Sequence, residues 1–197
     1  MQNLPSIHPI IPKKKSRPFD DDNWIFDLKY DGFRGLLYHD GKSRLFSRRG
    51  KRLQFPELEE KLSRCFGRHR LILDGEVVSL DESGHPIFYN LIQRQGSIVY
   101  VAFDLLWLDG RDLRKLALLE RKSGLDAFAR LKHSQFIRRG FSIRARGLDF
   151  FDTLVKKDLE GMVAKRSDSP YMPRTEWLKI LNPSYSQTHA RFRTMRS

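Results

Sequence analysis

Residues 24–34 read WIFDLKYDGFR, and this stretch decides the fold of the chain. An apolar run typical of a β-strand leads into Lys29, Asp31-Gly32 predicts a turn, and a second apolar run begins at Arg34. A lysine held between two strands beside a carboxylate is tightly positioned, and nearby cations or desolvation favour its neutral, nucleophilic amine. A single Lys-x-Asp-Gly motif is most often an ordinary strand end, so the interpretation depends on the rest of the chain.

The composition indicates a folded protein with an anionic partner. Of the 197 residues, 40% are hydrophobic and 12% aromatic, which suits one domain with tails. The net charge of +13 favours nucleic acid; an anionic membrane is the second candidate, but no basic amphipathic helix with a clean apolar face is evident. A single cysteine, Cys65, excludes an intramolecular disulfide and a cysteine-based zinc cluster. With no leader or membrane-length apolar run, we expect a soluble, cytoplasmic protein associated with the nucleoid.

Strand and helix patterns follow one another along the chain. The first strand is expected to be continued in the same sheet by Arg34–His39 and, after an Asp-Gly hairpin turn, by Arg44–Ser47. Further strands are predicted at Leu71–Val78, Ile98–Leu108, Glu160–Lys165 and Trp177–Leu181. Helices are predicted at Pro56–Cys65, Phe88–Gln93, Leu116–Leu131 and Gly147–Leu159.

The two longer helices have apolar stripes at helical spacing, with basic residues between the apolar ones in the first. The expected buried stripe of the helix at 116–131 comprises Leu118, Leu119, Leu125, Phe128 and Leu131. That of the helix at 147–159 comprises Leu148, Phe151, Leu154 and Val155.

The two ends of the chain differ from its middle. Residues 1–18 carry four prolines and a basic cluster, so we expect an extended arm, laid on the domain or free, that is either solvated or in contact with phosphates. Residues 19–182 are expected to form the domain itself. Residues 183–197 are polar and basic, without a core-forming pattern, and are expected to form a tail.

Five separate strands each present one polar residue of a type that handles nucleotide phosphates: Lys29, Arg34, Glu76, Lys165 and Lys179. Glu76 stands within an apolar strand, so its carboxylate needs an arginine, a metal or a ligand hydroxyl as a partner. On the last strand, Lys179 points opposite to Leu178 and Ile180. Asp31 and Glu160 add acidic groups, and Phe103 adds an aromatic surface.

In order and spacing, this set resembles the covalent nucleotidyltransferases and, more closely, the adenylation domain of ATP-dependent DNA ligases. The matching motifs are KYDGFR (29–34), FSRRG (46–50), DGE (74–76), YVAFDLLW (100–107), EGMVAK (160–165) and WLKI (177–180). Residues 105–122 and 158–171 also resemble bacterial repair ligases that occur alone or fused to an end-joining polymerase. The resemblance covers roughly residues 8–187, and six ordered motifs make it specific.

The resemblance implies an α+β fold in which two antiparallel β-sheets, flanked by helices, enclose a nucleotide cleft. It also implies ATP as the cofactor. Lys29 would attack the α-phosphorus of ATP, keep AMP as a phosphoramidate and release pyrophosphate. AMP would then pass to a DNA 5′-phosphate, and the nick would be sealed in DNA repair or recombination.

Further residues receive roles from the same resemblance. Asp27 and Leu28 would border the adenine, although the family usually has glutamate where Asp27 stands. Phe103 would stack on the base, with Met162 or Val163 on its opposite face.

The remaining roles concern sugar, phosphates and metal. Arg34 and Arg48 would hold ribose or phosphate oxygens and later the 5′-phosphate of a nick, while Lys165 and Lys179 would neutralise the α-phosphate. The expected ligands of Mg²⁺ or Mn²⁺ are Asp31, Glu76 and Glu160, with the ribose hydroxyls as the other expected partner of Glu76. Magnesium is commonly held by few carboxylates together with substrate phosphates, which suits this set.

Two features depart from the family pattern. The last motif usually reads lysine, any residue, lysine, but Leu181 follows where the second lysine is expected. Family members also carry a DNA-clamping OB-fold, and the sequence after Lys179 is too short for one. We therefore expect a partner protein to supply the OB-fold or an end-bridging function for nicked double-stranded DNA, or the chain to be a truncated or impaired ligase.

Two alternatives remain open at this point. An RNA ligase or a capping-type guanylyltransferase shares the core chemistry, although residues 105–122 favour DNA ligases. A non-catalytic, basic nucleic-acid-binding module would explain the charge and the missing lysine. It would not explain the intact catalytic set, for which DNA binding alone has no use: Lys29, Asp31, Arg34, Glu76 and Glu160.

Overall fold

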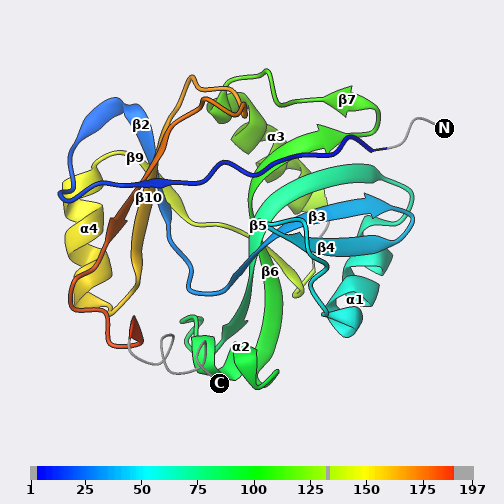
Figure 1. Cartoon of the computed structure of the whole chain (residues 1–197), viewed down its shortest axis with the longest axis horizontal. Helices are drawn as coiled ribbons and strands as arrows, with labels where there is room; N and C mark the ends of the chain where they lie inside the picture. The colour runs from blue at the N-terminus through cyan, green and yellow to red at the C-terminus, as the bar shows by residue number, and fades with distance from the viewer. Residues whose placement is uncertain (1–3, 132–133, 189–197) are drawn as a thin grey trace.

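The chain folds into two β-sheets with helices on their outer sides, as the computed structural model shows for residues 4–131 and 134–188 (Figure 1). One sheet has five strands in the order β1-β11-β10-β2-β9. The other has six, in the order β4-β3-β5-β6-β7, with β8 paired to β6. The expected α+β architecture of two sheets flanked by helices is confirmed.

The strands are β1 (Lys13–Lys14), β2 (Asp21–Leu28), β3 (Phe33–Asp40), β4 (Ser43–Ser47), β5 (Arg70–Leu80), β6 (Ser97–Leu108), β7 (Arg111–Asp112), β8 (Ile137–Arg139), β9 (Ser142–Ala145), β10 (Gly161–Arg166) and β11 (Trp177–Leu181). The helices are α1 (Pro56–Phe66), α2 (Phe88–Ile92), α3 (Leu118–Leu131) and α4 (Gly147–Lys156). Every predicted strand and helix is therefore present within a few residues. Four short strands were not predicted, because two to four residues carry too little periodicity to recognise: β1, β7, β8 and β9. Two of them, β1 and β8, form the parallel pairs in the otherwise antiparallel sheets.

The expectation that the first three strands share one sheet is wrong. β2 lies between β10 and β9 in the five-stranded sheet, whereas β3 lies between β4 and β5 in the other. The turn at Asp31-Gly32 therefore carries the chain from one sheet to the other. Local strand and turn patterns do not show which sheet a strand joins, since that depends on partners distant in sequence.

Three of the four apolar clusters among the described residues hold the layers together. The largest packs the helices α1, α2 and α3 on the six-stranded sheet, and another packs α4 on the five-stranded sheet through Phe26, Phe150 and Leu154. The third lies between the sheets and includes Leu36 from β3 and Trp177 from β11. The site described below borders this inter-sheet cluster.

The predicted apolar stripes of the two longer helices are partly wrong. In α4, Phe150 and Leu154 are buried, while Leu148 is 46% exposed. In α3, Leu119 is 46% exposed, whereas Arg121 is fully buried. Arg121 is buried because Asp104 accepts two hydrogen bonds from its guanidinium at 2.8 and 2.9 Å, a partner that periodicity does not reveal.

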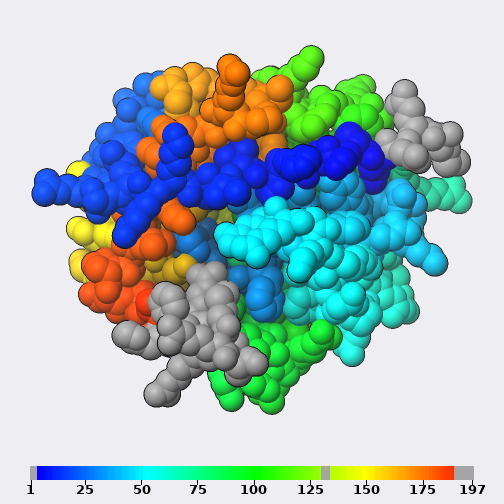
Figure 2. Space-filling model, viewed as in Figure 1, coloured from blue at the N-terminus to red at the C-terminus, as the bar shows by residue number. Residues whose placement is uncertain are grey.

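The N-terminal segment is laid across both sheets (Figures 1 and 2, blue). Ile7 and Ile10 are buried in the inter-sheet cluster, and Lys13–Lys14 pair in parallel with β11. At the other end, Tyr185 is buried against the domain. Residues 1–3 and 189–197 of the predicted arm and tail lie outside the described residues. No helix in the described parts is long and apolar enough to cross a membrane.

Candidate active site

Lys29 lies at the crossover between the sheets, directly after β2. Its backbone N–H donates to the carbonyl of Gly161 at 2.9 Å, which ties the turn to the start of β10. Its Nζ lies 2.6 Å from Glu160 Oε2, and the two side chains are only 20% and 10% exposed. A Cβ at Gly32 would come within 2.2 Å of the Val77 carbonyl oxygen, so only glycine allows the turn to approach β5 this closely.

Alternation along β10 and β11 decides which side chains face the inter-sheet cluster. Val163 packs against that cluster, whereas Met162 is fully buried on the α4 side. Val163 and Lys179 are paired in register, and Lys165 is paired with Trp177. Of the two candidates for the second face of the base, Val163 and not Met162 therefore lies on the side of Phe103.

Asp27 binds two buried lysines. Its Oδ2 lies 2.7 Å from Lys165 Nζ, and its Oδ1 lies 2.8 Å from Nζ of Lys122 on α3. Burial alone would raise the pKa of Asp27, but the two ammonium groups outweigh it and hold the pKa below its ordinary value. Burial lowers the pKa of Lys165, as does Lys122, while Asp27 opposes the shift. Sequence reasoning missed Lys122, which it counted among the basic residues between apolar positions.

Aromatic rings enclose the ammonium group of Lys165. Its Nζ lies 4.3 Å from the ring centroid of Phe103 and 3.8 Å from that of Trp177. The sequence places Trp177 in the last strand and in the WLKI motif without a role at the site, but a tryptophan over a buried lysine is a favourable cation–π partner. Phe103, from the six-stranded sheet, thus lies beside a cation from the five-stranded sheet.

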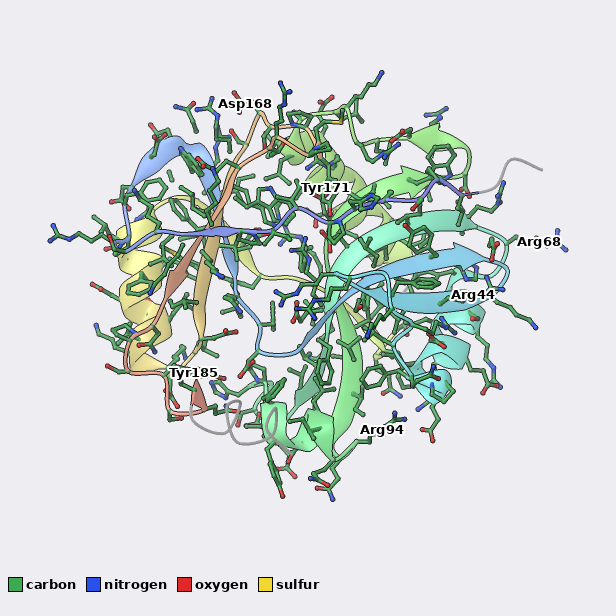
Figure 3. The ribbon with its side chains drawn as sticks, in the orientation of Figure 1. Arg44, Arg68, Arg94, Asp168, Tyr171 and Tyr185 are labelled. Atoms are coloured by element: carbon green, nitrogen blue, oxygen red, sulfur yellow. The ribbon has the colours of Figure 1, made fainter. Side chains whose placement is uncertain are left out.

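Arg34 is held in a network that closes the site on the side of the N-terminal segment. Its Nε and Nη2 donate to the two carboxylate oxygens of Asp74 at 3.0 and 2.6 Å, and its Nη1 donates to the Ile10 carbonyl at 2.6 Å. The Tyr171 hydroxyl, labelled in Figure 3, donates to the same carboxylate at 2.7 Å. Burial lowers the pKa of Arg34, but Asp74 outweighs burial and leaves the pKa above its ordinary value. Glu76 stands directly opposite Arg34 in the β3–β5 pairing.

Sequence reasoning missed Asp74 and Tyr171 as members of the site. Asp74 is the first residue of the DGE motif, and an acidic residue inside an apolar strand is the signal that could have identified it. Tyr171 follows β10 in a loop, and nothing local distinguishes it.

Asp31 lies in the crossover turn and is 1% exposed. The hydroxyl of Tyr185, near the C-terminal end of the described chain, donates to its Oδ2 at 3.1 Å (Figure 3 labels Tyr185). Burial, together with the carboxylates of Asp31 and Glu160, raises the pKa of Tyr185, which keeps the phenol protonated and donating.

The predicted metal ligands do not form a preassembled metal cage. Within residues 4–131 and 134–188 no group of three or more histidine, cysteine or acidic side chains is arranged to hold an ion. Glu160 is paired with Lys29, and Asp31 with Tyr185. The set therefore fits a divalent ion only if substrate phosphates supply much of its coordination.

Arg48 lies apart from the buried groups. It is exposed in the loop after β4 and lines a groove of about 590 Å³ between the N-terminal segment and the β3–β4 hairpin. Tyr38, Arg44 and Arg49 line the same groove. Arg48 therefore does not share the buried surroundings of Arg34 and Lys165.

Comparison with known proteins supports one family. Residues 6–180 match the model of the ATP dependent DNA ligase domain. The chain is 32% identical to the SPbeta prophage-derived DNA ligase-like protein LigB of Bacillus subtilis, over 92% of this chain and 69% of that protein. It is 36% identical to the multifunctional non-homologous end joining protein LigD of Pseudomonas aeruginosa over 80% of this chain, but spans only 20% of LigD.

Solved structures agree in fold. The ligase domain of Mycobacterium tuberculosis LigD superposes with a TM-score of 0.75 at 31% identity, over 87% of this chain and 58% of that one. A mycobacterial DNA ligase D complexed with ATP and MES has the same TM-score and identity over 88% and 59%. Chlorella virus DNA ligase-adenylate, at 16% identity and a TM-score of 0.67 over 88% and 68%, shares the fold.

Proposed function

The chain belongs to the ATP-dependent DNA ligase family, as its adenylation domain, and on that premise we propose that Lys29 is the residue that takes AMP from ATP. The observation that supports this most directly is the 2.6 Å approach of Lys29 Nζ to Glu160 Oε2 at the crossover between the sheets. A lysine so placed is fixed in direction by a carboxylate that can accept its proton.

In the proposed first step, the ammonium of Lys29 gives up one proton toward Glu160, and the free electron pair of the amine attacks the α-phosphorus of ATP. The second proton leaves the nitrogen for solvent or the departing pyrophosphate as the phosphoramidate forms. A nitrogen–phosphorus bond forms, the bond from the α-phosphorus to the pyrophosphate oxygen breaks, and pyrophosphate leaves. Phosphoryl transfer of this kind depends mainly on placement and on cations near the developing charge.

The binding residues follow from which side chains face the inter-sheet cluster. We assign Phe103 and Val163 to the two faces of the adenine, with Asp27 at its edge. The side chain of Leu28 packs on the α4 side, in register with Met162, so Leu28 would border the base only through its backbone. Lys165 and Lys179 are assigned to the α-phosphate. Because Lys165 is paired with Asp27, it would have to give up part of that ion pair when the phosphate arrives.

The other groups complete the pocket. Arg34 and Glu76 lie opposite each other on β3 and β5. Glu76 is assigned to the ribose hydroxyls, Arg34 to ribose or phosphate oxygens, and the exposed Arg48 to a DNA phosphate. A magnesium ion bound between Asp31, Glu76 or Glu160 and the substrate phosphates would offset the charge of the leaving pyrophosphate.

Transfer of AMP to the 5′-phosphate of nicked double-stranded DNA is the proposed sequel. The 3′-hydroxyl of the nick would then attack the activated phosphate and release AMP. The net charge of +13 supports a nucleic-acid substrate, and we place this activity at the nucleoid in the cytoplasm. A partner protein or a further domain would supply the OB-fold that encloses the duplex, as the family resemblance implies.

A mass measurement tests the first step. Wild-type protein incubated with ATP and magnesium should gain one AMP, on the peptide that contains Lys29. Lys29→Arg keeps the positive charge but provides no usable neutral amine, so it should gain none. Lys156→Arg, on the exposed side of α4, is the matched control and should label as wild type does. Labelling of the Lys29→Arg protein would show that the nucleophile is elsewhere.

A sealing assay tests the substrate. A duplex with a single 5′-phosphorylated nick should be joined when its strands are DNA. Faster joining of the same nick built from RNA would favour an RNA ligase. Adenylation of the protein without transfer to either nick would limit the function to the first step.

A further inference from the structure

The segment after β11 joins the two halves of the molecule, one built on the five-stranded sheet and the other on the six-stranded sheet, beside Lys29. The Asn182 side chain donates to the Leu159 carbonyl at 3.0 Å, and its N–H donates to the Glu160 carbonyl at 3.0 Å, both next to β10. Gln187 reaches the other half, where its Oε1 accepts from the N–H of Phe88 and its Nε2 donates to the Pro86 carbonyl, each at 3.1 Å. Tyr185 lies between these two anchors in the sequence.

Tyr185 is aimed at the crossover turn itself. It is 6% exposed, and its hydroxyl donates to Asp31 Oδ2 across 154 residues of sequence. Asp31 is 1% exposed and stands two residues after Lys29. A carboxylate this deeply buried requires donated hydrogen bonds, so losing one allows the turn that carries it to shift.

The part of the chain that matches the ATP dependent DNA ligase domain ends at residue 180, five residues before Tyr185. We infer that Tyr185 is a positioning residue for the nucleophile: its hydroxyl holds Asp31, and through Asp31 the turn, so that Lys29 stays directed at its target. This inference rests on the proposed function of Lys29. It also assigns a task to the segment following β11, beyond packing.

Tyr185→Phe tests the inference because it removes one oxygen and keeps the ring. The maximal rate of AMP labelling should fall about tenfold, as expected when a hydrogen bond to a charged group is lost. The ATP concentration at half-maximal rate should change less than about twofold, since Tyr185 holds the turn and not the nucleotide. Amide hydrogen exchange at residues 29–32 should become faster.

Gln187→Ala is the matched control. It loosens the same segment from the other half of the molecule without touching Asp31, so labelling and exchange at residues 29–32 should stay as in wild type. An equal change in Gln187→Ala and Tyr185→Phe would mean that the segment acts only by docking, which overturns the inference. Wild-type rate and wild-type exchange in Tyr185→Phe would overturn it as well.

Failure of the proposed function can be told apart from failure of this inference. If wild-type protein takes no AMP from ATP, the function assigned to Lys29 is wrong. Amide hydrogen exchange alone then tests whether Tyr185 holds the turn. Faster exchange at residues 29–32 in Tyr185→Phe, but not in Gln187→Ala, supports this contact as the one that fixes the turn. Unchanged exchange refutes it.

Discussion

At the scale of single residues, the unusual feature is one carboxylate that binds two buried lysines. Asp27, Lys122 and Lys165 are 4%, 4% and 1% exposed. One negative and two positive charges leave one excess positive charge among groups with little access to water. Such an arrangement is stable only while the carboxylate remains ionised and in place, because a buried ammonium without a partner is costly.

This arrangement predicts unequal effects of two substitutions on stability. Asp27→Asn leaves two buried ammonium groups without a counter-charge and should lower the free energy of unfolding by about 3–5 kcal/mol. Lys122→Met leaves the Asp27–Lys165 pair intact, removes the excess charge and keeps an apolar stem of similar length, so it should cost less than about 1 kcal/mol. Urea unfolding at neutral pH measures both.

The double variant Asp27→Asn with Lys122→Met provides the check. Adding Lys122→Met to the Asp27→Asn protein should restore part of the lost stability, because one of the two unpaired charges disappears. If the two single variants prove equally destabilising, the lysines do not depend on Asp27 in the way the geometry implies.

At the scale of secondary-structure elements, His39 fastens the β3–β4 hairpin to the end of α1. It is fully buried; its Nε2 lies 3.1 Å from the Gly67 carbonyl and its Nδ1 lies 3.0 Å from Ser43 Oγ. A carbonyl only accepts, so Nε2 carries the proton and Nδ1 accepts from the serine. Burial lowers the pKa of His39 below its ordinary value.

The lowered pKa predicts a loss of stability in mild acid. The unfolded chain takes up a proton on His39 near pH 6.5, while the folded chain resists it. The contribution of neutral His39 is therefore complete above that pH and is lost as the pH falls through the lower pKa of the folded state. In urea unfolding from pH 8 to pH 5, His39→Gln should show a smaller decline than wild type. Parallel declines would mean that groups other than His39 cause the acid sensitivity.

At the scale of the whole molecule, an extended N-terminal segment spans both sheets and one face of the protein (Figure 2). It donates from Ile7 N–H to the Tyr38 hydroxyl and provides the Ile10 carbonyl to Arg34, both on β3, before it pairs with β11. The arm predicted at residues 1–18 is thus, from residue 4 on, part of the packed structure. The boundaries of 19–182 for the domain and 183–197 for the tail remain a prediction.

The net charge of +13 predicts how the molecule binds DNA. Contacts should go mainly to phosphates, so affinity should fall steeply with salt, by roughly 10³-fold between 50 and 200 mM if about six phosphates are contacted. Duplexes of equal length and different sequence should bind within a few-fold of one another. Fluorescence anisotropy across a salt series measures both. A flat response to salt, or strong preference for one sequence, would contradict binding through phosphates.

The sequence alone determined the order of the elements and the chemical set of the site. Local patterns identified this set, because strand and helix periods are set by neighbouring residues. Examples are Lys29 after one apolar strand, Glu76 inside another, and the alternation of side chains around Lys179. The helices and long strands were predictable for the same reason. The six ordered motifs also indicated the family before any contact was known.

Only the tertiary structure decided which groups meet. That β2 and β3 belong to different sheets depends on their pairing with β10 and β5, far along the chain. Lys122 and Arg121 were expected to lie between apolar positions on the helix. Each is instead buried and forms an ion pair with a carboxylate from a β-strand. Tyr185 reaches Asp31 across 154 residues. Charge pairing at such separations leaves no periodic trace in the sequence, since its energy depends on the distance and burial that the completed fold provides.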